Sequence, residues 1–262
     1  MKLTMRKKSI EKILIKNKKQ IMKKESLLKF IEKYNLGDNI STVLIKSENN
    51  TVSVDFISDD KTAKGSVVMN DFKDLGESEL GIYSTGKLKK MLDVLDENID
   101  VDYKRESAAG KISSVIFYDK KIKTKYVVCE SSVIPVVPKL KSEPSYEIEI
   151  NIDTKFIDDF IKVNNAIDAE TFTIITDDNT VKFVFGYVKH TNTNTITLDI
   201  IAKTQSNIDE VTLNSNMLAE VLKANKDLKS GYIKVSSAGL SFVKFTSDKY
   251  ETEYYLVAVQ SM

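Results

Sequence analysis

The side chains that could perform chemistry are few and widely separated. The single histidine, His190, lies in the polar run 189–194, and the single cysteine, Cys129, ends an alternating apolar segment. A hydrolase needs a nucleophile, a base and an orienting group close together. Asp100 and Asp102 have the spacing of two carboxylates on one face of a strand, but no further carboxylate cluster supports a two-metal site there. We therefore expect a protein that is not an enzyme and that holds no metal or cofactor.

Phosphate-binding loops are also missing from the sequence. The chain has only nine glycines, and none of them falls in a Walker loop or a dinucleotide fingerprint. No run of about 18 apolar residues exists, so no membrane partner is expected. One cysteine in 262 residues allows no internal disulfide, which is typical of a reducing, cytoplasmic setting.

The net charge of +1 hides an uneven distribution. Residues 1–25 carry ten Lys or Arg and two Glu, so the 39 basic and 38 acidic residues of the whole chain leave 29 and 36 in 26–262. An acidic body does not attract nucleic acid as a whole. If this protein meets nucleic acid, its positive charge must be concentrated on one surface.

All three prolines, Pro135, Pro138 and Pro144, lie within eleven residues near the middle of the chain. Proline interrupts helices and sheet ladders, so this cluster indicates an extended connector. We place it at 133–144, between a first domain at 26–132 and a second at 145–262.

The two halves resemble each other in order. Four segments match at an offset of 129 to 131 residues: 30–35 with 160–165, 50–52 with 179–181, 79–84 with 210–215, and 88–92 with 218–222. Four matches in register favour a duplicated domain over a chance similarity. Each half is expected to contain two amphipathic helices, at 26–34 and 85–95 and at 154–166 and 215–225, packed against antiparallel strands. The fold class is then α+β, with two tandem domains.

Lysines occupy the polar faces of all four expected helices. We predict that they form a cationic surface: Lys29, Lys33, Lys87, Lys89, Lys90, Lys155, Lys162, Lys223 and Lys226. An ordinary solvated helix surface is the alternative for any one of them, because Glu32, Asp93 and other acidic residues share these helices. Their presence on four equivalent elements favours the functional interpretation.

The N-terminal residues 1–25 do not fit the repeat. Ile10, Ile13, Leu14 and Ile21 among many lysines are typical of a basic amphipathic helix that contacts DNA or an acidic partner. An upstream start codon, with translation beginning at Met22, is the other interpretation.

The layout resembles that of the DNA sliding clamps, the processivity factors of DNA polymerases. The order of segments from Ser26 to Met262 is similar to that of the tailed-phage clamps, which are related in fold to proliferating cell nuclear antigen. The best local pieces are 79–95 and 210–259. The resemblance implies a ring that encircles duplex DNA without sequence specificity and tethers the replicative polymerase in the cytoplasm of a phage-infected cell.

The resemblance also implies partners and sites. Two domains per chain would need three copies for a six-domain ring, a homotrimer closed by pairing 123–129 of one chain with 194–202 of the next. A polymerase and a clamp loader would each present a short peptide with apolar anchors. The expected pocket for it lies near the connector and the last strand, at Ile134, Val136, Val137, Leu256 and Val259. For each of these residues, simple packing of the connector is the alternative.

Two other functions stay open at this point. Phage tail and baseplate proteins can also be duplicated, β-rich and ring-forming, so the chain could be a ring-forming phage structural or assembly protein. A monomer with the clamp fold could instead bind linear DNA on an open basic face, without a loader.

Overall fold

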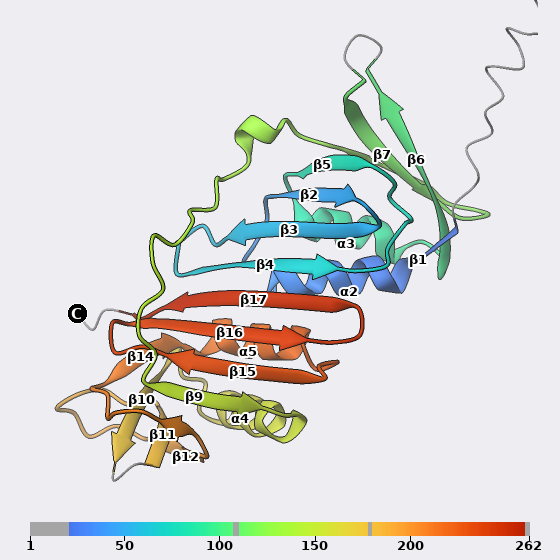
Figure 1. Ribbon diagram of the computed structural model, residues 1–262. Helices are drawn as coiled ribbons and strands as arrows, with labels where there is room; N and C mark the ends of the chain where they lie inside the picture. The colour runs from blue at the N-terminus through green and yellow to red at the C-terminus, as the bar shows by residue number, and fades with distance from the viewer. Residues whose placement is uncertain (1–20, 107–109, 178–179, 260–262) are drawn as a thin grey trace, which may run out of the picture.

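The computed structural model describes residues 21–106, 110–177 and 180–259, and its secondary structure repeats one order twice. Each half has a short strand, a helix, a group of strands, a second helix and three closing strands (Figure 1). The first half consists of β1 (Ile21–Lys23), α2 (Lys24–Asn35), β2 (Val43–Glu48), β3 (Thr51–Ile57), β4 (Ala63–Met69), β5 (Ser78–Ile82), α3 (Thr85–Asp93), β6 (Asn98–Arg105), β7 (Ile112–Tyr118) and β8 (Lys123–Val127).

The second half follows a short 3-10 turn, η1 (Ser131–Val133), and the rest of the connector. It consists of β9 (Ile148–Ile152), α4 (Thr154–Ile167), β10 (Thr171–Asp177), β11 (Thr180–Phe185), β12 (Ile196–Ile200), β13 (Lys203–Thr204), β14 (Val211–Asn214), α5 (Ser215–Ala224), β15 (Ser230–Val235), β16 (Leu240–Thr246) and β17 (Tyr250–Val257). Every strand pair is antiparallel, so the predicted α+β class is confirmed.

The four helices lie where their apolar periodicity predicts them. Asp153 caps α4 by accepting a hydrogen bond from Phe156 N at 2.7 Å, and Asn214 caps α5 by accepting one from Met217 N at 2.8 Å. Ser84 precedes α3 without such a side-chain bond. Asn49 and Asn50 both have positive φ, as a tight hairpin between β2 and β3 requires.

A single nine-stranded sheet runs through both halves, in the order β13-β9-β15-β16-β17-β4-β3-β2-β5. The two halves meet where β17 pairs with β4, from Tyr250 opposite Met69 to Leu256 opposite Ala63. Figure 1 shows the connector running outside this junction, from β8 to β9. The main-chain pairing between β4 and β17 therefore joins the halves independently of the connector.

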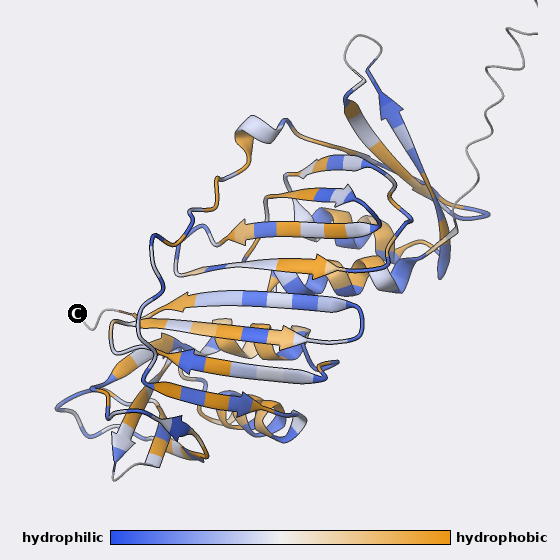
Figure 2. Ribbon diagram, in the orientation of Figure 1, coloured by the Kyte–Doolittle hydropathy of each residue, from blue (hydrophilic) through white to orange (hydrophobic). Residues whose placement is uncertain are grey.

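The helices form a row behind the central sheet, in which α3 contacts α2, α2 contacts α5, and α5 contacts α4 (Figure 1). Their buried residues face the strands, as in α4, where Ile157, Phe160 and Asn164 follow helical spacing. The strands alternate, with β4 and β17 burying every second residue (Figure 2). The opposite face of each helix is left to solvent.

Two smaller sheets complete the ends of the molecule. One has the order β1-β6-β7-β8 and the other β12-β11-β10-β14. In these sheets β8 and β12 each pair with one neighbour only, so each leaves one edge of main-chain N–H and C=O groups unpaired.

The N-terminal part of the described chain belongs to the first half. Residues 21–25, which the sequence assigned to a basic extension, form β1 and the first residues of α2, and the Met22 side chain is fully buried. The amphipathic helix expected around Ile10 to Leu14 lies outside the described residues. Across the described part of the chain, no helix is long and apolar enough to cross a membrane.

Candidate functional site

The residues considered for chemistry do not come together. His190 lies in the loop between β11 and β12, whereas Cys129 follows β8 in the other half, where its N–H donates to Gly81 O at 2.9 Å. Asp102 accepts a hydrogen bond from the N–H of its own neighbour, Tyr103. Within the described residues, no group of three or more His, Cys, Asp or Glu could hold a metal ion.

The predicted lysines do share one layer of the molecule, the row of helices. Lys29 and Lys33 lie on α2, Lys87, Lys89 and Lys90 on α3, Lys155 and Lys162 on α4, and Lys223 on α5, with Lys226 just beyond its end. All but Lys33 and Lys89 are exposed, and Lys89 is half-buried. The structure therefore gathers most of this set on the helix side of the central sheet.

Six of these nine lysines have a carboxylate within 4 Å. The pairs are Lys29–Glu25 at 2.8 Å, Lys33–Asp227 at 2.6 Å, Lys89–Glu32 at 3.9 Å, Lys155–Asp159 at 2.5 Å, Lys223–Glu220 at 2.8 Å and Lys226–Asp158 at 3.0 Å. The hydrogen bond that Lys155 donates to Asp159 raises the pKa of Lys155, and the one that Lys29 donates to Glu25 raises the pKa of Lys29. An exposed ion pair contributes only about 0.2–1 kcal/mol, so an incoming anion can replace the carboxylate.

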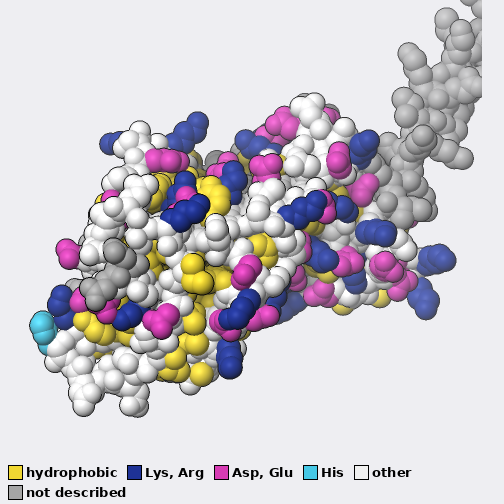
Figure 3. Space-filling view, turned by 60° about the horizontal axis from the view of Figure 1, so that its bottom comes forward, with side chains coloured by type: hydrophobic (Ala, Val, Ile, Leu, Met, Phe, Trp, Pro, Cys, Tyr) yellow, Lys and Arg dark blue, Asp and Glu magenta, His cyan; other side chains and the backbone are white. Residues whose placement is uncertain are grey.

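The other three lysines, Lys87, Lys90 and Lys162, are exposed and have no carboxylate partner among the described residues. Their ammonium groups are the ones immediately available to an anion such as a phosphate. Basic and acidic side chains are also interspersed on the surface in Figure 3, which brings the β12 end of the molecule forward. The helix face is thus of mixed charge, with local cationic positions on α3 and α4.

Lys33 requires a correction. We expected a solvent-facing lysine, but its side chain is only 2% exposed and lies between the two halves. Its Nζ donates to Ala224 O at 2.9 Å and to Asp227 Oδ1 at 2.6 Å. Burial lowers the pKa of Lys33, although Asp227 opposes that shift. The helical pattern placed Lys33 outside the apolar stripe of α2, but it could not show that the second half covers that side of the helix.

A groove on the opposite side of the sheet runs beneath the connector. It has a volume of about 340 Å³, and its lining includes Ile134, Val136 and Val137 from the connector with Leu44 and Val54 from β2 and β3. Val136 is 91% exposed. Lys64 on β4 fixes the connector further on, donating to Pro138 O at 2.8 Å. Three of the five residues expected in a peptide pocket are therefore together.

The other two expected pocket residues do not line this groove. Leu256 is 4% exposed and belongs to the core, and the N–H of Val259 donates to Thr212 O at 2.8 Å, on β14. Sequence reasoning missed Leu44, which is the middle residue of the apolar run Val43-Leu44-Ile45. An apolar run, unlike an alternating one, indicates that both faces of a strand are covered.

Solved structures of known proteins share this architecture. Proliferating cell nuclear antigen (PCNA) from Entamoeba histolytica superposes with a TM-score of 0.67 and 14% sequence identity, covering 92% of this chain and 98% of that one. The fold is that of PCNA. A PCNA2–PCNA3 complex from Sulfolobus tokodaii gives a TM-score of 0.64 at 10% identity, with the same coverage. The resemblance to DNA sliding clamps is thus confirmed at the level of the PCNA fold.

Sequence comparison alone does not reach this result. No protein-family model matches the chain, and no curated protein matches it either. The likeness to PCNA is carried by the arrangement of helices and sheets over nearly the whole length of both chains.

Proposed function

We propose that this chain is a sliding clamp, which assembles into a closed ring around duplex DNA and tethers a replicative DNA polymerase. The observation that carries the proposal is the junction of β4 with β17 inside the chain. The corresponding strands of the opposite halves, β12 and β8, each lie at one end of a smaller sheet and pair with a single neighbour among the described strands. The junction therefore provides a template for pairing β8 of one copy with β12 of the next.

The correspondence between the halves gives the register in which β8 of one copy would pair with β12 of the next. Cys129 N donates to Gly81 O after β8 as Val259 N donates to Thr212 O after β17, which relates β8 to β17 by 130 residues. Thr51 and Thr180 are the first residues of β3 and β11 and follow equivalent turns. Because β4 pairs with β3 as β12 pairs with β11, the two registers place β12 at an offset of 131 residues from β4. Since Thr252 lies opposite Val67, Ile122 should lie opposite Leu198 of a second copy.

The surfaces at these edges support the assembly. Ile122, which directly precedes β8, and Val127 on β8 are 40% and 52% exposed, and Ile201, next to β12, is 98% exposed. Ile161 and Val163 on α4 are half-buried, whereas their counterparts on α2, Ile31 and Lys33, are buried, and Lys33 lies against Ala224 and Asp227 of the second half. Apolar side chains thus remain open at the positions that a neighbouring copy would cover. Two halves per chain favour a homotrimer, since three copies supply six domains.

The row of helices would line the hole. Lys90 and Lys162 have no carboxylate partner in the part of the chain that the structure describes and would make the first phosphate contacts. The paired lysines Lys29, Lys155, Lys223 and Lys226 would exchange their carboxylates for phosphates. Lys87 corresponds to Met217, which is buried at the internal junction, so it would lie nearer the boundary between copies. Weak, mobile contacts of this kind suit a ring that holds DNA by enclosure.

The groove under the connector would hold partners. The groove lies on the outer side of the sheet, and its lining combines apolar residues with the polar Lys46, Ser53 and Asp55. This mixture fits a short peptide that has apolar anchors and is presented by a polymerase or a clamp loader. Ile134, Val136 and Val137 remain the proposed contacts, joined by Leu44. Leu256 would act only by supporting the sheet beneath.

Cross-linking tests the ring directly. In a Cys129→Ala background, Lys123→Cys and Thr197→Cys should lie directly opposite each other across the boundary, within the Cα separation of about 4.4–6.8 Å that a disulfide allows. Oxidation should give a covalently closed trimer. The matched pair Lys123→Cys and Asp199→Cys, shifted by two residues along β12, should cross-link poorly. Similar yields from both pairs, or a chain that stays monomeric, would reject the proposed register or the ring.

Retention on circular DNA tests whether the ring encloses the duplex. Rings closed by oxidation in the presence of nicked circular DNA should stay on it in high salt, which removes phosphate contacts, and should leave when the circle is cut. Closed trimers that never retain DNA would favour a structural or assembly ring instead. Tight, salt-resistant binding to linear DNA by single chains would favour an open basic face.

A further inference from the structure

A buried polar cluster joins the two halves of the chain on the helix side of the β4–β17 pairing. At its centre is the Lys33 ammonium, which donates to Ala224 O at 2.9 Å and to Asp227 Oδ1 at 2.6 Å. Ala224 ends α5, so the positive charge lies at the C-terminal end of that helix, where the helix dipole favours a cation. Lys33 also lies 4.8 Å from the centre of the Tyr250 ring.

Asn225 completes the cluster. Its Nδ2 donates to Val221 O and to Tyr254 Oη, both at 2.8 Å, and its Oδ1 accepts from Thr252 Oγ1 at 3.0 Å. The Tyr254 hydroxyl in turn donates to the main-chain O of Lys33 at 2.8 Å. Asn225, Thr252 and Tyr254 are each no more than 2% exposed. The cluster therefore fits one arrangement of α2, α5 and β17.

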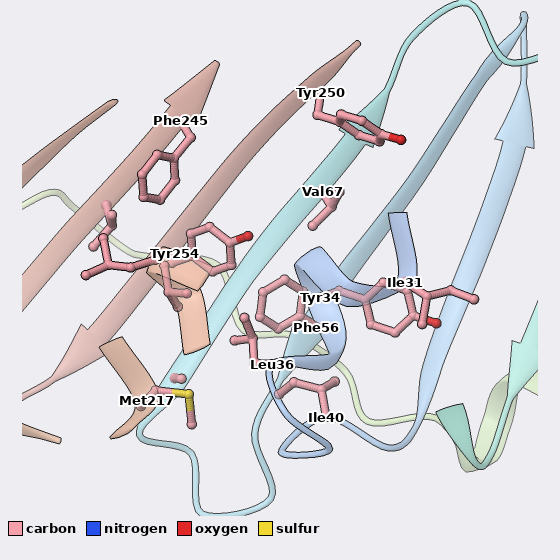
Figure 4. Close-up of a cluster of buried hydrophobic side chains, with 14 of the residues drawn as sticks. Ile31, Tyr34, Leu36, Ile40, Phe56, Val67, Met217, Phe245, Tyr250 and Tyr254 are labelled. Atoms are coloured by element: carbon pink, nitrogen blue, oxygen red, sulfur yellow. The ribbon is translucent and has the colours of Figure 1, made fainter. Parts of the chain in front are cut away.

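The apolar surroundings make the match strict. Figure 4 shows Tyr254 of the second half beside Val67 and Phe56 of the first, and the ring centroids of Phe56 and Tyr254 are 5.9 Å apart. A buried ammonium without its acceptors, or a buried amide without its donors, is strongly unfavourable in such an environment. Lys33 is therefore tolerated only where acceptors such as Ala224 O and Asp227 Oδ1 face it, whereas Asn225 and its partners Thr252 and Tyr254 shape that site from within the second half.

The corresponding positions at the open ends have a different chemistry. Lys33 corresponds to Val163, since the fully buried Phe30 and Phe160 occupy the same place on α2 and α4. Asn225 corresponds to Leu95, since Asn225 N donates to Leu222 O as Leu95 N donates to Leu92 O. By the same offset, Thr252 and Tyr254 correspond to Ile122 and Thr124. Lys33, Asn225 and Thr252, three of the five polar side chains of the cluster, therefore correspond to apolar residues at the open ends.

We infer that this difference distinguishes the two kinds of junction: the Lys33–Asn225 cluster makes β4 and α2 selective for β17 and α5, and leaves the apolar β12 and α4 to β8 and α3 of another copy. The inference rests on the proposed ring. A wrong pairing of β8 with β4 would bury Lys33 against Leu95 and Ile122. A wrong pairing of β17 with β12 would put Val163 in the place of Lys33, so Ala224 O and Asp227 Oδ1 would lose the ammonium that donates to them. Either pairing is disfavoured, so copies join in one order.

Val163→Lys tests this selectivity without disturbing the fold, because Val163 is half-buried at an open end. The added ammonium would face Leu95 and Ile122 of a neighbour. We expect a folded monomer in analytical ultracentrifugation, with the dissociation constant of the assembly raised by at least about 100-fold. Val163→Ile keeps the apolar surface and should assemble like the wild type. Val133→Lys, an equivalent change on the connector at a side chain that is 64% exposed, should also assemble normally.

The converse variant, Lys33→Met with Asn225→Leu, gives the internal junction the character of the open ends. Its chains should fold, as circular dichroism would show, and form a broad range of oligomers in place of one species. The inference is overturned if Val163→Lys assembles like the wild type, or if the double variant yields only the wild-type oligomer. A wild-type chain that stays monomeric at high concentration would instead reject the proposed ring itself.

Discussion

Gly65 of β4 and Glu253 of β17 approach so closely that a Cβ added at Gly65 would lie 2.2 Å from the Glu253 carbonyl oxygen. The same Cβ would lie 2.7 Å from the Phe56 ring, so neither neighbour leaves room for it. Close packing of β4 on β17 therefore depends on a residue without a side chain.

Gly65→Ala should destabilise the whole chain, because relieving the contact requires moving the main chain of β17. We expect a loss of about 2 kcal/mol in the free energy of unfolding, measured by urea denaturation. Ser66→Ala, at the next position of β4, is the control and should change stability by less than about 0.5 kcal/mol. Equal effects of the two variants would contradict the importance of this contact.

Asn225 and Asp227 both bind the Lys33 ammonium but should differ in importance. Asn225→Ala removes the buried acceptor of Thr252 Oγ1 and the amide that donates to the Tyr254 hydroxyl, so we expect a loss of about 3 kcal/mol. Asp227→Asn should cost no more than about 1 kcal/mol, because the Asp227 side chain is 40% exposed and solvent weakens the pair. Urea denaturation of both variants measures the difference, and a larger loss for Asp227→Asn would show that the ion pair dominates.

Removing carboxylates from the helix face should increase its affinity for DNA. Asp158→Asn with Asp159→Asn frees Lys226 and Lys155, so we expect tighter binding to a short duplex and a plot of log affinity against log salt that is steeper by up to about two units. Fluorescence anisotropy at several salt concentrations measures both quantities. Glu106→Gln with Glu143→Gln removes the same charge away from the helices and should have a smaller effect. Lys90→Ala with Lys162→Ala should weaken binding.

Asp119 should make stability depend on pH near the start of β8. The N–H groups of Ile122, Asp96 and Lys121 donate to its carboxylate and lower the pKa of Asp119. A lowered folded-state pKa means that the carboxylate stabilises the fold above the unfolded-state pKa of about 3.9, and that this contribution is lost as pH falls through the folded-state value. Urea denaturation from pH 7 to 3 should show a smaller decline for Asp119→Asn than for the wild type.

The groove beneath the connector should be separable from assembly. Val137→Asp places a charge among Leu44, Ile134 and Val54, and we expect at least about a tenfold loss of affinity for a polymerase-derived peptide with apolar anchors. Calorimetric titration of the peptide measures this loss, and sedimentation should show unchanged assembly. An equal loss from Val188→Asp, an exposed valine in the loop after β11, would argue against the groove.

Local signals were sufficient to predict much of the fold. Helical spacing of apolar residues located these four helices to within two residues at each end, and the three prolines all lie in the segment between β8 and β9. These features depend on interactions within a few residues, which a single sequence records. The phage type of the clamp and the trimer stay predictions.

Long-range contacts were not accessible in this way. The pairing of β4 with β17 joins segments near opposite ends of the chain, and no spacing in either strand indicates its partner. Lys33 looked solvent-facing on α2 because the stripe formed by Leu27, Phe30 and Ile31 does not include it. Lys226 and Asp158 are 68 positions apart, so their pairing could not be predicted from helical spacing. The sequence predicted that the candidate lysines lie on the helix side of the sheet, which is so for most of them. It did not predict which of them have a carboxylate partner.

The path of the connector has a consequence for the gene as well as for the protein. Its residues lie outside the nine-stranded sheet, and the two halves meet through β4, β17 and the helices. A break in the chain between η1 and β9 would leave all of these contacts in place. Two half-length polypeptides could therefore rebuild the same particle, so a split of the coding sequence at this point is compatible with the fold.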